Sequence, residues 1–188
     1  MEKLKLVVAC FVTIVSLSVP VFGQSYAEAE SYVVDNEASI IMANYLSEGL
    51  TDKFGWFAFS WVADDYAQAY AGITYCPVNW IQLGVGGGLE QAENPWRIAG
   101  SIWMGNESET FSTLHIFETG GSGFWCRNQL NYQIIDWLGM GIHSEYLMGI
   151  GPRAQISIPS TPVQFWATPL YDFKTGRLNA ISGLAINW

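Results

Sequence analysis

Hydrophobic residues alternate with polar or small residues along several segments of the chain. Between residues 138 and 148 the even positions are mainly apolar, whereas the odd positions include Gly139, Gly141, His143 and Glu145. The same alternation recurs in residues 81–86, 127–134 and 153–158. A period of two places successive side chains on opposite faces of a β-strand. The pattern therefore predicts strands with one apolar face and one polar or small face.

Turn-forming residues divide the chain at nearly even intervals. Clusters rich in Gly, Pro, Asn, Asp and Ser lie at residues 48–52, 63–65, 77–79, 93–95, 106–109, 119–123, 135–137, 149–151, 159–162 and 173–176. Each interval holds one strand and a short turn, which is the arrangement of an up-and-down meander. These ten breaks predict eleven strands between Glu37 and Trp188.

The composition indicates that part of this chain faces an apolar solvent. Half of the residues are hydrophobic and 13% are charged, against roughly 25% charged in ordinary soluble domains. No segment after residue 23 has the run of about 18 apolar residues that a membrane helix needs. Only helices and closed barrels satisfy their backbone hydrogen bonds in lipid. These observations favour a transmembrane β-barrel.

Aromatic residues gather at predicted strand ends, as in the aromatic girdles of membrane barrels. They are Trp80, Trp96, Phe124, Trp125, Trp137 and Trp188. The alternative is a soluble β-domain in which the same aromatics pack hairpins, because alternation alone is common to both folds.

The last eight residues, 181–188, form an alternating segment with Gly183, then Ile186 at the third-last position and Trp188 at the end. This segment resembles the closing strand of bacterial outer-membrane β-barrel proteins, in which it serves as the assembly signal. Ile181 stands where a polar residue is usual, and Trp188 replaces the commoner Phe. The resemblance implies an outer-membrane location, with outer-membrane lipid and the barrel-assembly machinery as partners, and it specifies no particular function.

The first 23 residues read as a secretory signal peptide. A basic opening precedes the mainly apolar residues 6–19, and Val21 and Gly23 supply small residues at the −3 and −1 positions of a cleavage site. An N-terminal membrane anchor is the alternative, but the apolar stretch is short for about 30 Å of hydrocarbon.

The predicted fold is an all-β, antiparallel, up-and-down transmembrane barrel formed by residues 37–188. Bacterial single-chain barrels have an even number of strands. Either residues 24–36 supply a twelfth strand, which we favour, or one break is false and the count is ten. Residues 24–36 could instead form a short helix or a loose tail.

Acids and arginines recur in the predicted outward hairpins. If Trp188 lies in the periplasm, the loops after Val62, Glu90, Glu118, Met148 and Asp172 face outward. In four hairpins an acid ends the rising strand and an arginine opens the falling one: Glu90 with Arg97, Glu118 with Arg127, Glu145 with Arg153, and Asp172 with Arg177.

Three interpretations of these charges remain open. Ion pairs across a hairpin would fix its register, at about 0.2 to 1 kcal/mol each. A ring of mixed charge could narrow a lumen and set ion selectivity. The arginines could also bind phosphates of lipopolysaccharide or of another surface partner.

Other polar residues are predicted to face the lumen, namely Gln129, Asn131, Gln133, His143 and Gln155. His115 is also expected to project inward. Ser144 follows His143 directly and so points to the opposite face, where His143 cannot activate it. We therefore predict no enzymatic activity, no metal site and no cofactor. The glycine run 84–88 lacks the lysine of a phosphate-binding loop and reads as room for a bulky neighbour or as a strand bend.

The predicted function is a small porin-like channel with a mixed-charge outer rim that passes small solutes or ions. One alternative is a structural or surface-binding barrel whose lumen is plugged by its own side chains, Trp103 and Trp166 among them. A second alternative is an outer-membrane lipid-modifying enzyme. No nucleic-acid partner is expected. Cys76 and Cys126 should be free thiols, because the predicted topology places them at opposite ends of the barrel.

Overall fold

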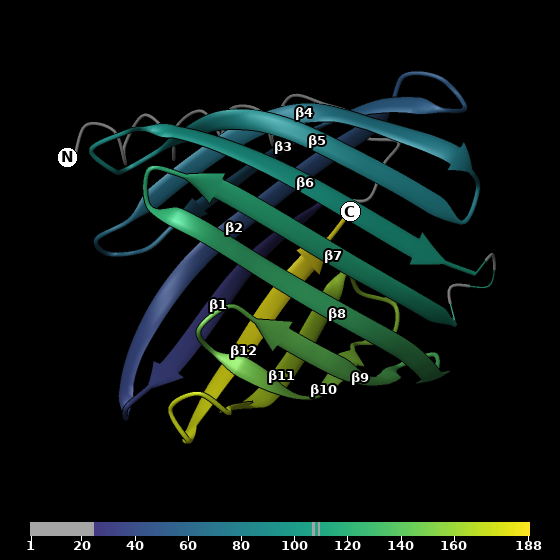
Figure 1. Cartoon of the computed structure of the whole chain (residues 1–188). Helices are drawn as coiled ribbons and strands as arrows, with labels where there is room; N and C mark the ends of the chain where they lie inside the picture. Colours follow the sequence, from purple (N-terminus) through teal and green to yellow (C-terminus); the bar gives the residue numbers. More distant parts are fainter. Residues whose placement is uncertain (1–24, 107, 109) are drawn as a thin grey trace.

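The structure, a computed structural model, describes residues 25–106, 108 and 110–188. The predicted signal peptide, residues 1–23, lies outside this range. The described chain is a closed antiparallel barrel of twelve strands (Figure 1). The strands are β1 (Tyr26–Val34), β2 (Glu37–Gly49), β3 (Phe54–Val62), β4 (Ala67–Val78), β5 (Ile81–Glu90), β6 (Trp96–Gly105), β7 (Phe111–Gly120), β8 (Gly123–Ile135), β9 (Leu138–Glu145), β10 (Gly149–Ser157), β11 (Val163–Asp172) and β12 (Arg177–Asn187).

The barrel closes between the first strand and the last, which lie side by side in purple and yellow in Figure 1. Tyr26 is opposite Asn187, and two main-chain hydrogen bonds of 2.9 and 3.2 Å join Ser25 to Trp188 beyond the strand ends. Within the segment 24–36, Tyr26–Val34 therefore forms the first strand, not a helix or a tail. The twelve-strand prediction is confirmed, and the ten-strand alternative is wrong. We call the end that holds Ser25 and Trp188 the terminal end, and the other the opposite end.

One predicted turn is misplaced. The break expected at residues 149–151 lies inside β10, and the turn occupies residues 146–148 instead. Leu147 takes the left-handed conformation there, with φ of 65°, although it is not a residue that usually marks a turn. Gly149 and Gly151 lie where the main chain of β11 approaches closely, so these glycines provide room between strands.

Large apolar side chains cover the outward face of the barrel. They include Ile73, Val85, Ile98, Phe117, Ile142 and Leu184, all exposed. Most strands have the 9 or more residues needed to cross a bilayer at a tilt, about 9 to 11. This face matches the apolar band of a transmembrane barrel. In residues 25–106, 108 and 110–188, no helix is long and apolar enough to span a membrane.

The aromatic residues expected at the membrane interfaces lie mostly as predicted. Trp80, Trp96, Phe124, Trp137 and Trp188 are exposed at strand ends or turns. Trp125 differs, because it shares the inner face of β8 with Arg127 and stacks near Trp61 in the lumen. Its neighbour Phe124 takes the outward position.

Two apolar clusters occupy the inside of the barrel. The larger one fills part of the opposite half and consists of Tyr32, Ile41, Met148, Trp166, Leu170 and Ile181. The smaller one contains Phe57, Tyr70 and Ala99. A Cβ atom added at Gly86 would lie 2.8 Å from the Phe57 ring. The glycine run 84–88 therefore provides room for a bulky neighbour, as predicted.

Candidate functional site: the charged lumen

Arg97 lies inside the barrel between two glutamates. Its Nη1 is 2.8 Å from Glu90 Oε2, and its Nη2 is 2.7 Å from Glu118 Oε2. The three side chains come from the adjacent strands β6, β5 and β7, and all are at most 4% exposed. The Glu90–Arg97 pair is one of the four expected across hairpins. The second acid, Glu118, had been assigned to Arg127, so that assignment is wrong.

Hydroxyl and amide groups complete this cluster, which we call the Arg97 cluster. Tyr70 donates a hydrogen bond of 2.8 Å to Glu118, and Gln68 donates one of 3.0 Å to the same carboxylate. Tyr66, in the loop between β3 and β4, donates to Glu90. Burial, together with the bond to Glu90, raises the pKa of Tyr66 to about 12, so its hydroxyl stays protonated as a donor.

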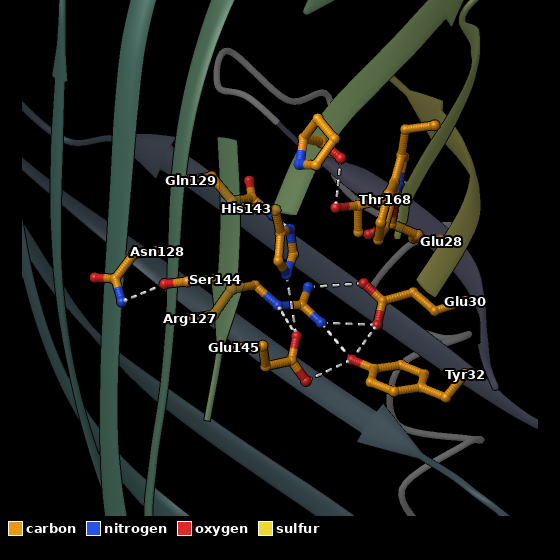
Figure 2. Close-up of polar contacts among 12 residues, drawn as sticks. Glu28, Glu30, Tyr32, Arg127, Asn128, Gln129, His143, Ser144, Glu145 and Thr168 are labelled. Atoms are coloured by element: carbon orange, nitrogen blue, oxygen red, sulfur yellow. Dashed lines mark hydrogen bonds and ion pairs between the residues drawn. The ribbon is translucent and has the colours of Figure 1, made fainter. Parts of the chain in front are cut away.

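A second arginine, Arg127, also bridges two glutamates, and we call this group the Arg127 cluster (Figure 2). Its Nη1 is 2.7 Å from Glu30 Oε1, and its Nε is 2.8 Å from Glu145 Oε2. The Tyr32 hydroxyl lies 3.0 Å from Glu145 and 2.9 Å from Glu30, and it donates its single hydrogen to one or the other carboxylate. The sequence analysis favoured a strand in residues 24–36 but assigned none of its side chains to the lumen, so it missed Glu30 and Tyr32. Their alternation with Ala29 and Ser31 was the available signal.

Arg153 does not pair with Glu145 as expected. Its guanidinium carbon lies 3.8 Å from the centroid of the Trp166 ring, in a cation–π contact. Arg153 Nε and Nη1 have no hydrogen-bond partner among the described residues. Trp166 in turn donates its Nε1 hydrogen to Glu28, a second lumen acid that the sequence analysis missed.

The fourth expected hairpin pair is also wrong. Arg177 bonds to Asp35 of the neighbouring hairpin at 2.6 Å, and both side chains are more than half exposed. Asp172 accepts hydrogen bonds from its own loop, at Lys174 N and Thr175 Oγ1. Three of the four expected pairs therefore do not form as predicted, and for Arg127 the reason is the shape of the barrel. Inner-face side chains point toward a common axis, so acids and arginines from distant strands can meet there.

The polar residues predicted for the lumen share the inner face. Gln129 pairs with His143, Asn131 with Gly141 and Gln133 with Gly139 in the β8–β9 register. Gln155 donates a long hydrogen bond of 3.5 Å to Gln133. His143 is fully buried, with its Nε2 3.3 Å from Glu145 and its Nδ1 3.4 Å from Gln129.

His115 faces outward, contrary to expectation. It pairs with Asn128 and Ile102 on the lipid-facing side, and its Nδ1 is 2.8 Å from Asn128 Oδ1. Asn128 donates to Ser144 across 3.3 Å, a contact that Figure 2 also shows. His143 and Ser144 thus lie on opposite faces, as predicted. Asn128 separates His115 from Ser144, so neither histidine is placed to activate this serine.

A cavity of about 380 Å³ occupies the terminal half of the lumen. Its lining reaches the turns between β2 and β3 and between β4 and β5, through Thr51 and Asn79. It also includes Tyr70, whose hydroxyl bonds to Glu118 of the Arg97 cluster. The cavity therefore extends from the terminal end to Tyr70, which lies between it and the buried Glu118. We call it the vestibule. In the described residues, no group of three or more His, Cys, Asp or Glu side chains is placed to hold a metal ion.

The fold and the lumen define an antiparallel transmembrane β-barrel with a charged interior, and the solved structures similar to it include porins. KdgM porin has 12% sequence identity and a TM-score of 0.56, over 87% of this chain and 99% of that one. KdgM porin in complex with disordered oligogalacturonate has 13% identity and a TM-score of 0.56, over 88% and 98%. NanC porin has 9% identity and a TM-score of 0.54, over 86% and 97%.

No protein-family model and no curated protein matches this chain. At such low identities the structural likeness shows the fold alone. The fold is that of the bacterial outer-membrane porins.

Proposed function

We propose that this protein is a narrow outer-membrane channel for small solutes. The observation that carries the proposal is the vestibule, which is lined by turns of the terminal end and ends at Tyr70, the residue that bonds to Glu118 of the Arg97 cluster. Rings of charged side chains are a common way to make a selective constriction. Because both ends of a bacterial barrel chain lie in the periplasm, the vestibule would face the periplasm. The Arg97 and Arg127 clusters would form the constriction toward the cell surface.

The charge of the constriction favours cations and neutral solutes over anions. Each cluster combines one arginine with two glutamates, so acids outnumber bases in both. Glu28 adds a further acid and Arg153 a further base, both beside Trp166, so the five acids of this region still outnumber its three arginines. An excess of one sign in a low-dielectric cleft raises the local concentration of the opposite sign. The mixed charge that we expected at the outer rim would then act inside the lumen.

The outer membrane is the location that fits the apolar outward face and the closing strand. We infer that Gly183, Ile186 and Trp188 act as the signal for the barrel-assembly machinery, with outer-membrane lipid around the finished barrel. Gly183 also has a role in packing, because a side chain at this position would collide with the Trp166 indole in the lumen.

Solute flux into proteoliposomes tests the proposed channel. We expect L-arabinose, which is neutral, to enter faster than glucuronate, which is an anion. Glu118→Gln should reduce this discrimination, because it removes a negative charge from the constriction. Asp172→Asn, half-buried at the loop end of β11 with its carboxylate bonded to its own loop, is the control and should leave the discrimination unchanged. Impermeability to both solutes in vesicles that contain folded protein would contradict the proposal.

A structural or surface-binding barrel without a pore is the second candidate. The larger apolar cluster favours it, because Leu170 and Ile181 are at most 1% exposed and Trp166 is 3% exposed. Of the two tryptophans expected to plug the lumen, Trp166 lies in this cluster, whereas Trp103 lines the vestibule. The flux measurement separates the two candidates, since a plugged barrel passes neither solute.

We assign no enzymatic activity to the lumen or to the outer face. Hydrolysis of a labelled phospholipid that is lost on His143→Ala would restore the lipid-modifying alternative. His143 and Ser144 on opposite faces give no nucleophile and base within reach of each other.

A further inference from the structure

Five aromatic rings form a continuous series on the inner wall of the vestibule. Tyr26 stacks on Tyr45 with ring centroids 5.6 Å apart, and Tyr45 stacks on Phe57 at 6.0 Å. Phe57 meets Tyr70 edge-on at 6.1 Å, and Tyr70 lies 4.9 Å from Phe59. All five residues line the cavity. We call them the aromatic ladder, which spans the inner faces of β1 to β4.

The barrel wall makes room for this ladder. Added Cβ atoms at Gly72 and Gly86 would lie 2.6 and 2.8 Å from the Phe57 ring, so glycines let the ring rest against the wall. Gly72 on β4 is the register partner of Phe57 on β3, and Gly86 on β5 is the register partner of Gly72. The rings therefore lie along the wall of the vestibule, where Phe57 and Tyr70 are buried and Tyr26, Tyr45 and Phe59 present the more open surface.

Polar groups line other parts of the same cavity. Ser101 and Thr74 contribute hydroxyls, and Gln82 contributes an amide. A volume of about 380 Å³ is within the range of small-molecule sites, about 300 to 1,000 Å³. Apolar walls with a few polar groups are the usual composition of such sites.

This combination matches the chemistry of a pyranose ring. A sugar presents its C–H groups on its flat faces and its hydroxyls at the edges. The π-face of an aromatic ring is electron-rich and attracts polarised C–H groups, while edge hydroxyls can bond to side chains such as Ser101 and Gln82. A sugar carboxylate would suit the ladder less well, because Tyr70 is bonded to the buried acid Glu118, whereas the cation of the vestibule lining, Lys53, lies in the turn between β2 and β3 at the terminal end.

We propose that the aromatic ladder binds neutral mono- or disaccharides, which makes them the preferred solutes of the channel. This inference rests on the proposed channel function. Binding itself, however, can be measured on folded protein in detergent without any conduction. Failure of saccharide binding and failure of the channel are therefore separate results.

Cys76 is a natural reporter for this site, because it lines the vestibule, while Cys126 lies on the outward face of β8. The experiment follows modification of each thiol by a water-soluble methanethiosulfonate reagent, with maltose as the probe. With maltose at about ten times its Kd, the site is about 90% occupied, and we expect Cys76 modification to slow about ten-fold. Cys126 modification should not change. Galacturonic acid at the same concentration should protect Cys76 less than maltose does.

Two variants test whether the protection of Cys76 by maltose depends on the aromatic ladder. Tyr45→Leu removes one ring but keeps its apolar bulk, and it should abolish protection, whereas Tyr45→Phe should retain it. Tyr75→Leu is the matched control, because Tyr75 faces outward from β4. Unchanged Cys76 modification in wild-type protein with maltose would overturn the proposal. So would protection by p-cresol without protection by maltose, since that would define a general apolar site.

Discussion

Arg127 and Glu30 are 97 positions apart in the sequence and form two parallel hydrogen bonds of 2.7 and 2.9 Å inside the barrel. One residue comes from β8 and the other from β1, so the pair joins two distant parts of the wall. It also connects the first strand to the charged lumen. The same contact thus links barrel stability to the proposed constriction.

Arg127→Gln should destabilise the barrel strongly, because it leaves Glu30 and Glu145 buried without their cation. Breaking a buried pair by removing one partner costs about 3 to 5 kcal/mol. Arg177→Gln is the control, since the Arg177–Asp35 pair is more than half exposed and should contribute at most about 1 kcal/mol. Urea unfolding in lipid vesicles measures both changes. Equal losses of stability in Arg127→Gln and Arg177→Gln would contradict the prediction that the buried ion pairs contribute more than the exposed one.

Arginine substitutions on the two faces of β8 and β9 should destabilise the barrel for different reasons. Ile142 is exposed on the outward face, so Ile142→Arg should cost about 2 to 4 kcal/mol in lipid. Gln133→Arg, on the lumen face, should be tolerated. Gly141→Arg should be limited by space, because even a Cβ would collide with the main chain of β8. The same unfolding titration applies, and equal tolerance at Ile142 and Gln133 would show that the faces are assigned wrongly.

Local patterns were sufficient to predict the strands, since alternation and turn residues act within a few positions of each other. They located even the inner-face positions of Gln129 and Gln133. The misplaced turn at residues 146–148 shows the limit of this approach. Leu147 takes a left-handed backbone there that its residue type does not signal, and the nearby glycines serve close strand contacts instead.

The lumen contacts could not be predicted from the sequence in the same way. The hairpin pairing rule found Glu90 with Arg97, which are adjacent across one turn. It failed for Arg127, whose partner Glu30 depends on where the barrel closes and how its inner side chains converge. Such contacts are set by the whole barrel, so no local spacing records them.

Deletion of Trp188 should impair assembly, because Trp188 and Ser25 exchange the last main-chain hydrogen bonds at the seam between β1 and β12. We expect less folded protein in the outer-membrane fraction, measured by heat-modifiable mobility on a gel. Trp137→Ala, at an exposed turn away from the seam, is the control. Normal yield after deletion of Trp188 would refute its role as an assembly signal.

The two cysteines of the described chain should remain reduced. Cys76 lies near the terminal end on the inner face, and Cys126 lies near the opposite end on the outward face. Both are free in the structure, and a disulfide needs Cα atoms within about 7 Å. Mass spectrometry of denatured, non-reduced and alkylated protein should show both thiols modified. An intramolecular Cys76–Cys126 bond would be incompatible with the strand order.

Single-channel recording in planar bilayers is the most direct test of the central claim, that the lumen is a charged channel. The protein should first show heat-modifiable mobility, so that its folded state is established. We expect stepwise currents, with a reversal potential under a salt gradient that indicates cation preference, because each cluster has one arginine for two glutamates. Electrical silence from folded, inserted protein would contradict the channel and favour the plugged barrel.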